Sequence, residues 1–244
     1  MNIRVAGLVL PVVAGIGVAV TSCSAPGTAQ PVVSATGPVS SIAISGSFTA
    51  SSTASPAVSI SPGPVPAGYQ RVGGAAQGIS VAAPASWAVV NLAGETVQSA
   101  ASKMNLRGAS GTAIRADMES GLKWHAVFAF DVKTAVDDPL PPDLNAFCLQ
   151  TGTIGVGAVG VPLLTAVSAS AVERLGATHI TQKDLDIGGV PGVETSFQVS
   201  YSRGTVHSSE LAVFPKRGEE CEVAVAGPSE ASLASVAAAT AQFP

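Results

Sequence analysis

The stretch of residues 24–66 limits where this chain can fold, because it contains no charged side chain and is built almost wholly of Ser, Ala, Thr, Pro, Gly and Val. A continuous helix is excluded by seven prolines, namely Pro26, Pro31, Pro38, Pro56, Pro62, Pro64 and Pro66. Such a composition cannot bury enough apolar surface to offset the entropy lost on ordering. We therefore expect residues 24–66, which follow Cys23, to form a disordered linker and residues 67–244 to form a single globular domain.

Residues 1–22 have the features of an export signal. Arg4 precedes an uncharged, mostly aliphatic stretch of 16 residues, 5–20, which is shorter than the roughly 20 apolar residues of a membrane-spanning helix. A positive charge followed by a short apolar segment is typical of a secretory signal peptide. The stretch ends in Val20-Thr21-Ser22-Cys23, which resembles the lipobox of bacterial lipoproteins. The alternatives are an uncleaved anchor and an ordinary signal peptide with a chance cysteine.

The lipobox resemblance implies a modification and a location. The chain would be cut before Cys23, whose thiol would carry diacylglycerol, with acyl chains such as palmitate. A single acyl chain binds a membrane only marginally, whereas two or three chains on one residue anchor it stably. We therefore expect a lipid-anchored protein on the outer face of the cell membrane. Its predicted partner is the membrane itself, bound through the N-terminal lipid.

The charge of the remaining chain restricts its partners. The sequence has 12 basic and 16 acidic side chains, and Arg4 is the only charged residue before residue 67, so the predicted domain carries a formal charge of −5. A net negative charge disfavours nucleic acids and anionic lipid headgroups as partners.

Hydrophobic periodicity and turn residues predict the elements of the domain. We expect a hairpin over 69–84 that turns at Gly73-Gly74, and a strand that ends at Val89-Val90. Helices are predicted over 95–106, 112–120 and 162–175, and a last helix is predicted after a Ser229 cap. The remaining strands are predicted over 123–132, 144–150, 178–187, 193–202, 205–214 and 220–226, with turns at Gly188-Gly189 and Arg203-Gly204. Strands in a run, with helices set apart from them, predict an α+β fold in which helices cover an antiparallel sheet.

Four short segments, taken together, resemble the LpqN/LpqT-type lipoproteins of mycobacteria and related actinobacteria. They are Pro84 to Trp87, Ala126-Val127-Phe128-Ala129-Phe130, Asp143-Leu144-Asn145-Ala146 and Glu173-Arg174-Leu175-Gly176-Ala177. The resemblance covers most of residues 68–244 and implies a PsbP-like α/β/α sandwich. The family has no agreed catalytic residues, and its members are regarded as envelope or ligand-binding accessory proteins rather than enzymes.

The cysteine count predicts one disulfide. Three cysteines are an odd number for an exported protein, but lipidation of Cys23 leaves a pair, Cys148 and Cys221, in an oxidising compartment. Strand alternation points both side chains toward the core. We therefore predict a Cys148–Cys221 bridge with Cα atoms about 4.4–6.8 Å apart; two separately buried free thiols are the alternative.

Possible catalytic and binding motifs are weak. The glycines of residues 155–160 match the spacing of a dinucleotide-binding loop, but Pro162 follows closely and the acidic residue expected near position 180 is missing. His125, expected in a strand, His179 and His207 form no paired metal-ligand spacing. The acidic residues Asp137, Asp138 and Asp143 lack the spacing of a calcium loop and are expected in a solvated loop. Trp87 is expected in the core.

Three functions remain open. The first is a non-catalytic cell-envelope accessory that interacts with another envelope protein, and it is the one we favour. The second is a carrier of an apolar or lipidic ligand held between sheet and helices. The third is a hydrolase whose Ser-His-Asp residues are distant in sequence. We expect no cofactor, no metal site and no enzymatic activity.

Overall fold

The computed structural model describes residues 57–106, 108–133, 141–150, 165–166, 168–170, 172–174, 176–201 and 204–244. Cys23, the glycines of residues 155–160, Asp137 and Asp138 lie outside the described residues.

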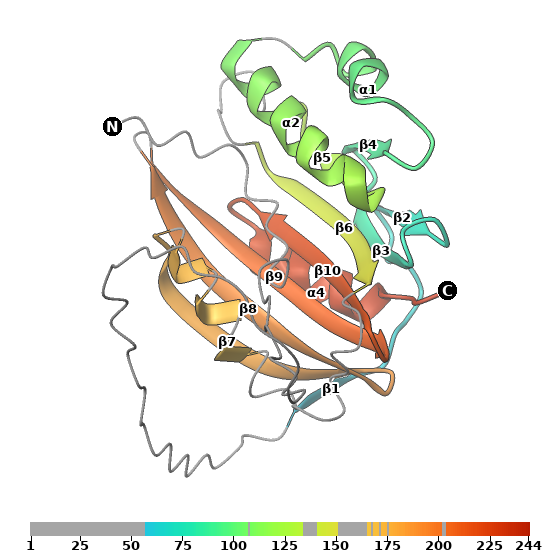
Figure 1. Ribbon diagram of the computed structural model, residues 1–244, viewed down its shortest axis with the longest axis vertical. Coiled ribbons are helices and arrows are strands. Elements are labelled where there is room, and N and C mark those ends of the chain that lie inside the picture. Colours follow the sequence, from blue (N-terminus) through green and yellow to red (C-terminus); the bar gives the residue numbers. More distant parts are fainter. Residues whose placement is uncertain are drawn as a thin grey trace, which may run out of the picture. The chain divides into compact units, whose positions relative to one another are not determined.

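An eight-stranded sheet dominates the described chain, with the strand order β1-β7-β8-β9-β10-β6-β5-β4 (Figure 1). Every neighbouring pair is antiparallel except β1 and β7, which are parallel. The strands are β1 (Val58–Ile60), β4 (Ala88–Asn91), β5 (Val127–Phe130), β6 (Asp143–Gln150), β7 (Thr178–Ile187), β8 (Val190–Tyr201), β9 (Gly204–Lys216) and β10 (Glu219–Ala226). The C-terminal meander β7–β10 therefore joins β6, β5 and β4 only through the pairing of β10 with β6.

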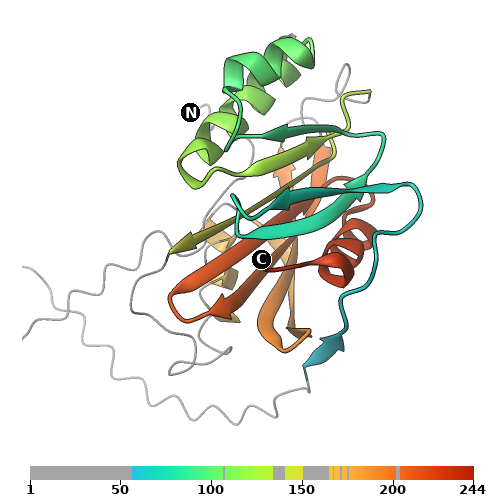
Figure 2. The ribbon, with the colours of Figure 1, turned by 90° about the vertical axis from the view of Figure 1, so that its right-hand side faces the viewer.

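One face of this sheet is closed by helix α4 (Glu230–Thr240) and by a hairpin of β2 (Tyr69–Gly74) and β3 (Ile79–Pro84) (Figure 2). Side chains from β6, β9 and β10 on this face pack with Leu233 and Ala237 of α4 and with Ile79 and Val81 of β3. The helix is fixed to the hairpin because Thr240 Oγ1 accepts the Ala82 N–H at 2.9 Å. We name this closed layer the α4 face.

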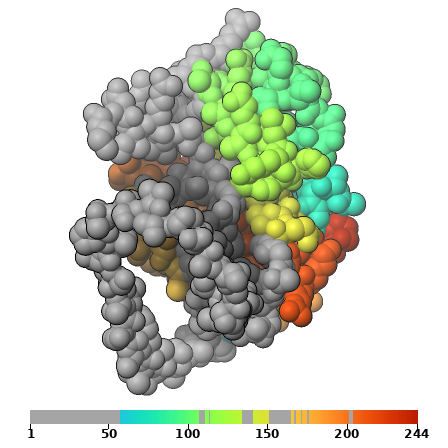
Figure 3. Space-filling view, in the orientation of Figure 1, coloured from blue at the N-terminus to red at the C-terminus, as the bar shows by residue number. Residues whose placement is uncertain are grey.

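The opposite face is covered over β4, β5 and β6 by α1 (Val97–Lys103) and α2 (Gly108–Gly121), which lie together in Figure 3. Ile114 and Met118 of α2 pack on Phe128, Phe130 and Phe147 of the sheet in a second core. The close approach requires a glycine at the end of α2, since a Cβ on Gly121 would lie 2.7 Å from the Phe128 ring. Next to α2 the 3₁₀ helix η1 (Leu122–Trp124) leads into β5. We name this layer the α2 face.

A third apolar cluster lies on the far part of the α2 face. It contains Phe197 and Val199 of β8 and Val172, which belongs to the helical residues 172–174. The described residues within the predicted helix 162–175 are helical. Helices thus cover a sheet that is antiparallel except for the β1–β7 pair, and the fold is α+β as predicted. None of the described helices is long and apolar enough to span a membrane.

Several local predictions were wrong. The first hairpin turns at residues 75–78, and Gly73-Gly74 close β2 instead. His125 does not lie in a strand but ends η1 in the left-handed region, with φ 54°. Ser229 precedes α4 without a side-chain capping bond. Asp143 does not lie in a solvated loop: it is the first residue of β6 and is partly buried.

The folded unit also begins before the predicted boundary at residue 67. Val58–Ile60 pairs with Leu185, Asp186 and Ile187 of β7, and Ile60 O accepts the Gly188 N–H at 2.8 Å. Gly63 N–H donates to Ala239 O at 2.7 Å. The C-terminal end of the predicted linker is therefore part of the sheet.

We predict that a chain beginning at Pro56 is more stable than one beginning at Ala67. The longer chain keeps the β1–β7 ladder and the Gly63 bond, and a net hydrogen bond contributes about 1 kcal/mol. Urea unfolding should give the longer chain a higher midpoint with a free energy of unfolding larger by about 1–3 kcal/mol. Equal midpoints would show that β1 adds nothing to the fold.

Candidate functional site: the β6–β10 seam

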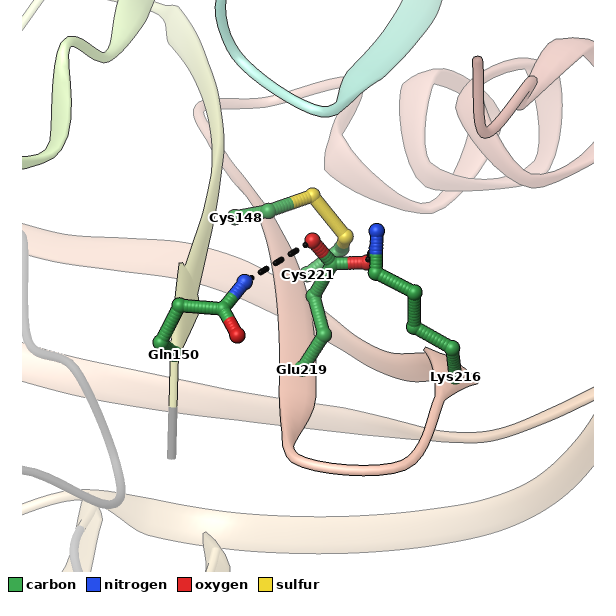
Figure 4. The surroundings of a disulfide bond; sticks show 5 residues. All are labelled: Cys148, Gln150, Lys216, Glu219 and Cys221. Carbon is green, nitrogen blue, oxygen red and sulfur yellow. Dashed lines mark hydrogen bonds and ion pairs between the residues drawn. A yellow bond between two sulfur atoms is a disulfide. The ribbon is translucent and has the colours of Figure 1, made fainter. Parts of the chain in front are cut away.

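The predicted disulfide is present and joins β6 to β10 (Figure 4). Cys148 and Cys221 are direct cross-strand partners, and their Cα atoms lie 3.9 Å apart. This is shorter than the predicted range of about 4.4–6.8 Å. Cys221 is fully buried in the core of the α4 face, and Cys148 packs against it. The expectation that both side chains point toward the core is therefore confirmed.

Polar contacts surround the bridge. Gln150 Nε2 donates to Glu219 Oε1 at 3.1 Å, and Lys216 Nζ lies 3.1 Å from Glu219 Oε2 (Figure 4). The Cys148 N–H donates to Gln77 O at 2.8 Å. Gly78 approaches so closely that a Cβ there would lie 2.8 Å from Cys148 Sγ. The tip of the β2–β3 hairpin is thus packed directly on the bridge.

The opposite face of the same seam carries buried acids. Glu220 and Glu222 alternate with Cys221 and Val223, so they point to the α2 face. Their exposed fractions are only 1% and 2%. Glu210 of β9 is also buried and faces the same way, because its neighbour Leu211 lies in the core of the α4 face.

Cross-strand register places these acids beside polar residues of β6. One row across the sheet runs from Thr195 through Glu210 and Ala224 to Asn145 and Phe128. In the next row Glu222 lies between Ala212 and Phe147. We call the set Glu210, Glu220, Glu222, Asn145, Asp143 and Asp117 the acidic belt; Asp117 is a buried residue of α2.

Burial raises the pKa of four belt carboxyls, those of Glu210, Glu220, Asp117 and Asp143. It raises the pKa of Glu220 to about 7 and, with the nearby charge of Glu220, raises the pKa of Glu210 far above its ordinary value. Burial and the charge of Asp143 raise the pKa of Asp117 to about 8. Burial also raises the pKa of Asp143, while a hydrogen bond from the Asn145 side chain lowers it by a smaller amount. The belt therefore holds protons at neutral pH that ordinary carboxyls release.

Several belt oxygens lack a hydrogen-bond partner in the described part of the chain. They are Asp117 Oδ1, Asn145 Oδ1, Glu210 Oε1 and Glu220 Oε2. Each such buried atom costs about 1–3 kcal/mol. The ion pairs found among the described residues use other carboxylates, those of Glu95, Glu194, Glu219 and Glu230. The seam thus combines one covalent bond with a set of incompletely satisfied acids.

The structure does not bring the predicted candidate residues together. His125, His179 and His207 are exposed, and they lie after η1, in β7 and in β9. His207 Nδ1 is 3.7 Å from Glu230 Oε1. Trp87 is partly buried against the core of the α4 face, as expected. Among the described residues, no group of three or more His, Cys, Asp or Glu side chains could hold a metal ion.

The acidic belt is not among the sites predicted from the sequence. The period of two in residues 219–226 assigns Glu220 and Glu222 to the side opposite the cysteine, and that signal was available. The pattern does not show that this second side is also buried. Glu210 lies in a continuous run of buried β9 residues, Ser209 to Phe214, where strand alternation gives no contrast.

Comparisons with known proteins give a limited likeness. No protein-family model matches the chain, and no curated protein matches it. Among solved structures it is similar to cyanobacterial PsbP (CyanoP) from Synechocystis sp. PCC 6803, with 12% identity and a TM-score of 0.46. The match covers 73% of this chain and 94% of that chain.

We predict that removing the bridge lowers stability substantially. In a full-length Cys23→Ser parent, adding Cys148→Ser and Cys221→Ser releases a loop constraint of 73 residues, worth up to about 4 kcal/mol. Urea unfolding of the parent with and without reductant should reproduce the loss. Two titratable thiols in the unfolded, unreduced parent would contradict the bridge.

We also predict that stability falls as pH rises. The folded state binds more protons than the unfolded state between the ordinary carboxyl pKa, about 4.3, and the raised values near 7 and 8. The free energy of unfolding should therefore decrease from pH 5 to pH 8.5 by more than about 1 kcal/mol. Urea titrations at several pH values measure this slope.

The matched variants for this slope are Glu210→Gln with Glu220→Gln and, as a control, Glu119→Gln. Glu119 is an exposed acid on α2. The belt variant should flatten the pH dependence while the control leaves it unchanged. An equal slope in all three proteins would mean that the belt acids titrate normally.

Proposed function

We propose that this chain is an exported lipoprotein, anchored by lipid at Cys23 to the outer face of the cell membrane. Its folded domain would be a non-catalytic accessory or interaction module of the cell envelope. The observation that supports this proposal is the Cys148–Cys221 disulfide.

The bridge supports export because disulfides persist in oxidising compartments and are rare in the cytosol. It also uses two of the three cysteines, which leaves Cys23 as the one cysteine at the end of the lipobox-like segment. The resemblance to LpqN/LpqT-type lipoproteins agrees with this role, since those proteins are regarded as envelope accessories.

The acidic belt supports a binding role for the domain. Native folds rarely leave buried polar atoms without partners, so a group of them needs a specific reason. Binding sites provide one, because their polar groups are satisfied only when the ligand is present. The belt lies at the centre of the sheet. Two of the strands that carry it, β6 and β10, are joined by the disulfide on the other face of the sheet.

A second candidate function is a carrier of a ligand with an apolar part. The observation that favours it is the position of the belt between two apolar clusters, one around Phe147 and one around Phe197. Native mass spectrometry of protein purified from its own host separates the two roles. A co-purifying protein supports the interaction module, and a bound lipid or other small molecule supports the carrier.

We predict that the mature protein begins at a diacylglyceryl-modified Cys23. Mass spectrometry of membrane-bound protein should find the modified N-terminal peptide, because the lipobox directs both lipid transfer and cleavage. Cys23→Ala should release the protein from membranes or leave an uncut precursor, while Cys148→Ala should leave it membrane-bound. An unmodified Cys23 in membrane-bound protein would refute the anchor.

A further inference from the structure

We propose that the acidic belt binds an organic cation, namely a primary ammonium group that carries an apolar body. This proposal deepens the binding role proposed above by naming a ligand class. It is independent of the lipid anchor at Cys23, so the two can fail separately.

A small residue lies between two polar residues of the belt. In the row across the sheet, Ala224 is the only residue between Glu210 and Asn145. Both polar side chains are buried, whereas Ala224 is partly exposed. Strands lie about 4.8 Å apart, so the two polar residues are separated by roughly 10 Å at their backbones. A small, partly exposed residue therefore separates two buried polar side chains.

The unpartnered atoms of the belt indicate which groups a ligand must offer. The belt atoms that lack partners in the described chain are oxygens, Asn145 Oδ1, Glu210 Oε1, Glu220 Oε2 and Asp117 Oδ1; outside the belt, the donor Arg115 Nε of α2 also lacks one. A carboxylate oxygen and an amide oxygen accept hydrogen bonds, so the ligand must donate them. The Asn145 amide does not take up a proton itself, so its unpartnered oxygen needs a donor from another group.

The spacing of the acids favours an organic cation over a metal ion. The acids lie at separate positions along β9 and β10, and the described residues contain no convergent group that could hold a metal ion. An ammonium group offers three donors and a positive charge that replaces the proton held by a buried carboxyl. Binding should thus release protons from Glu210 or Glu220.

Apolar side chains on both sides of the belt indicate the character of the rest of the ligand. In the register, Glu222 is beside Phe147, whose ring stacks on Trp124 at 4.9 Å. On the other side of the belt, Phe197 belongs to the cluster around Val172. If the cation of a ligand lies between these clusters, the rest of the ligand contacts apolar side chains. The body of the ligand should therefore be apolar.

Isothermal titration calorimetry of the full-length Cys23→Ser protein at pH 7.5 tests the proposal with hexylamine as the probe. Hexanol has the same apolar body without the charge and serves as the control ligand. We expect saturable binding of hexylamine, roughly tenfold or more tighter than hexanol. Its apparent enthalpy should change with the ionisation enthalpy of the buffer because protons are released.

Three variants make the test specific. Glu210→Gln should weaken hexylamine binding by roughly tenfold. Ala224→Val should also weaken it, because it adds bulk between Glu210 and Asn145 without changing any charge. Glu119→Gln, an exposed acid on α2, should bind as the parent does. Circular dichroism confirms that each variant is folded, and either belt variant suffices if the other does not fold.

The proposal is overturned if hexylamine does not bind, if hexanol binds equally well, or if neither folded belt variant weakens binding. In those cases the belt is a structural set of protonated acids, while the lipoprotein proposal is untouched. Conversely, an unmodified Cys23 would remove the anchor without changing the outcome of the titration.

Discussion

The pairing of β6 with β10 is the interaction on which the rest of this structure depends. Among the strands that the structure describes, the C-terminal meander β7–β10 is hydrogen-bonded to the group β6, β5 and β4 only there. If these two strands separate, the sheet divides and each helix layer loses part of its support. The Cys148–Cys221 bond lies at this seam, so the covalent constraint acts where loss of contact would damage the fold most.

The same seam also contains buried groups that lower the stability of the fold. On the α4 face Cys221 and Val223 belong to an apolar core, while on the α2 face Glu220 and Glu222 are buried. Burial of carboxyls disfavours their charged forms and destabilises the fold at neutral pH. The disulfide offsets this cost because it raises the free energy of the unfolded chain. A strand that carries acids in its centre is thus tolerated beside a permanent cross-link.

The sequence predicts the meander well and the acidic belt poorly, for physical reasons that particular residues illustrate. β7 spans 178–187 as expected, and the other three strands begin and end within a few residues of the predicted limits, because alternation and Gly188-Gly189 act locally. β1 was missed because three residues between prolines have no periodicity of their own; pairing with β7 defines them. Glu220 and Glu222 were assigned to a strand correctly, but whether a second layer covers their face depends on distant segments. The same limit applies to His125, whose backbone is set by the end of η1.

The contrast between the two faces of β10 also explains why a binding role is consistent with a stable fold. Core packing on the α4 face is closed by α4 and by the hairpin, whose Gly78 lies directly against Cys148. No polar group of the belt is needed for that packing. The acids on the α2 face can therefore be changed to neutral isosteres with little loss of core contact, and removal of their desolvation cost should stabilise the domain at neutral pH. Residues that lower stability where they stand are those for which a role other than folding has to be sought.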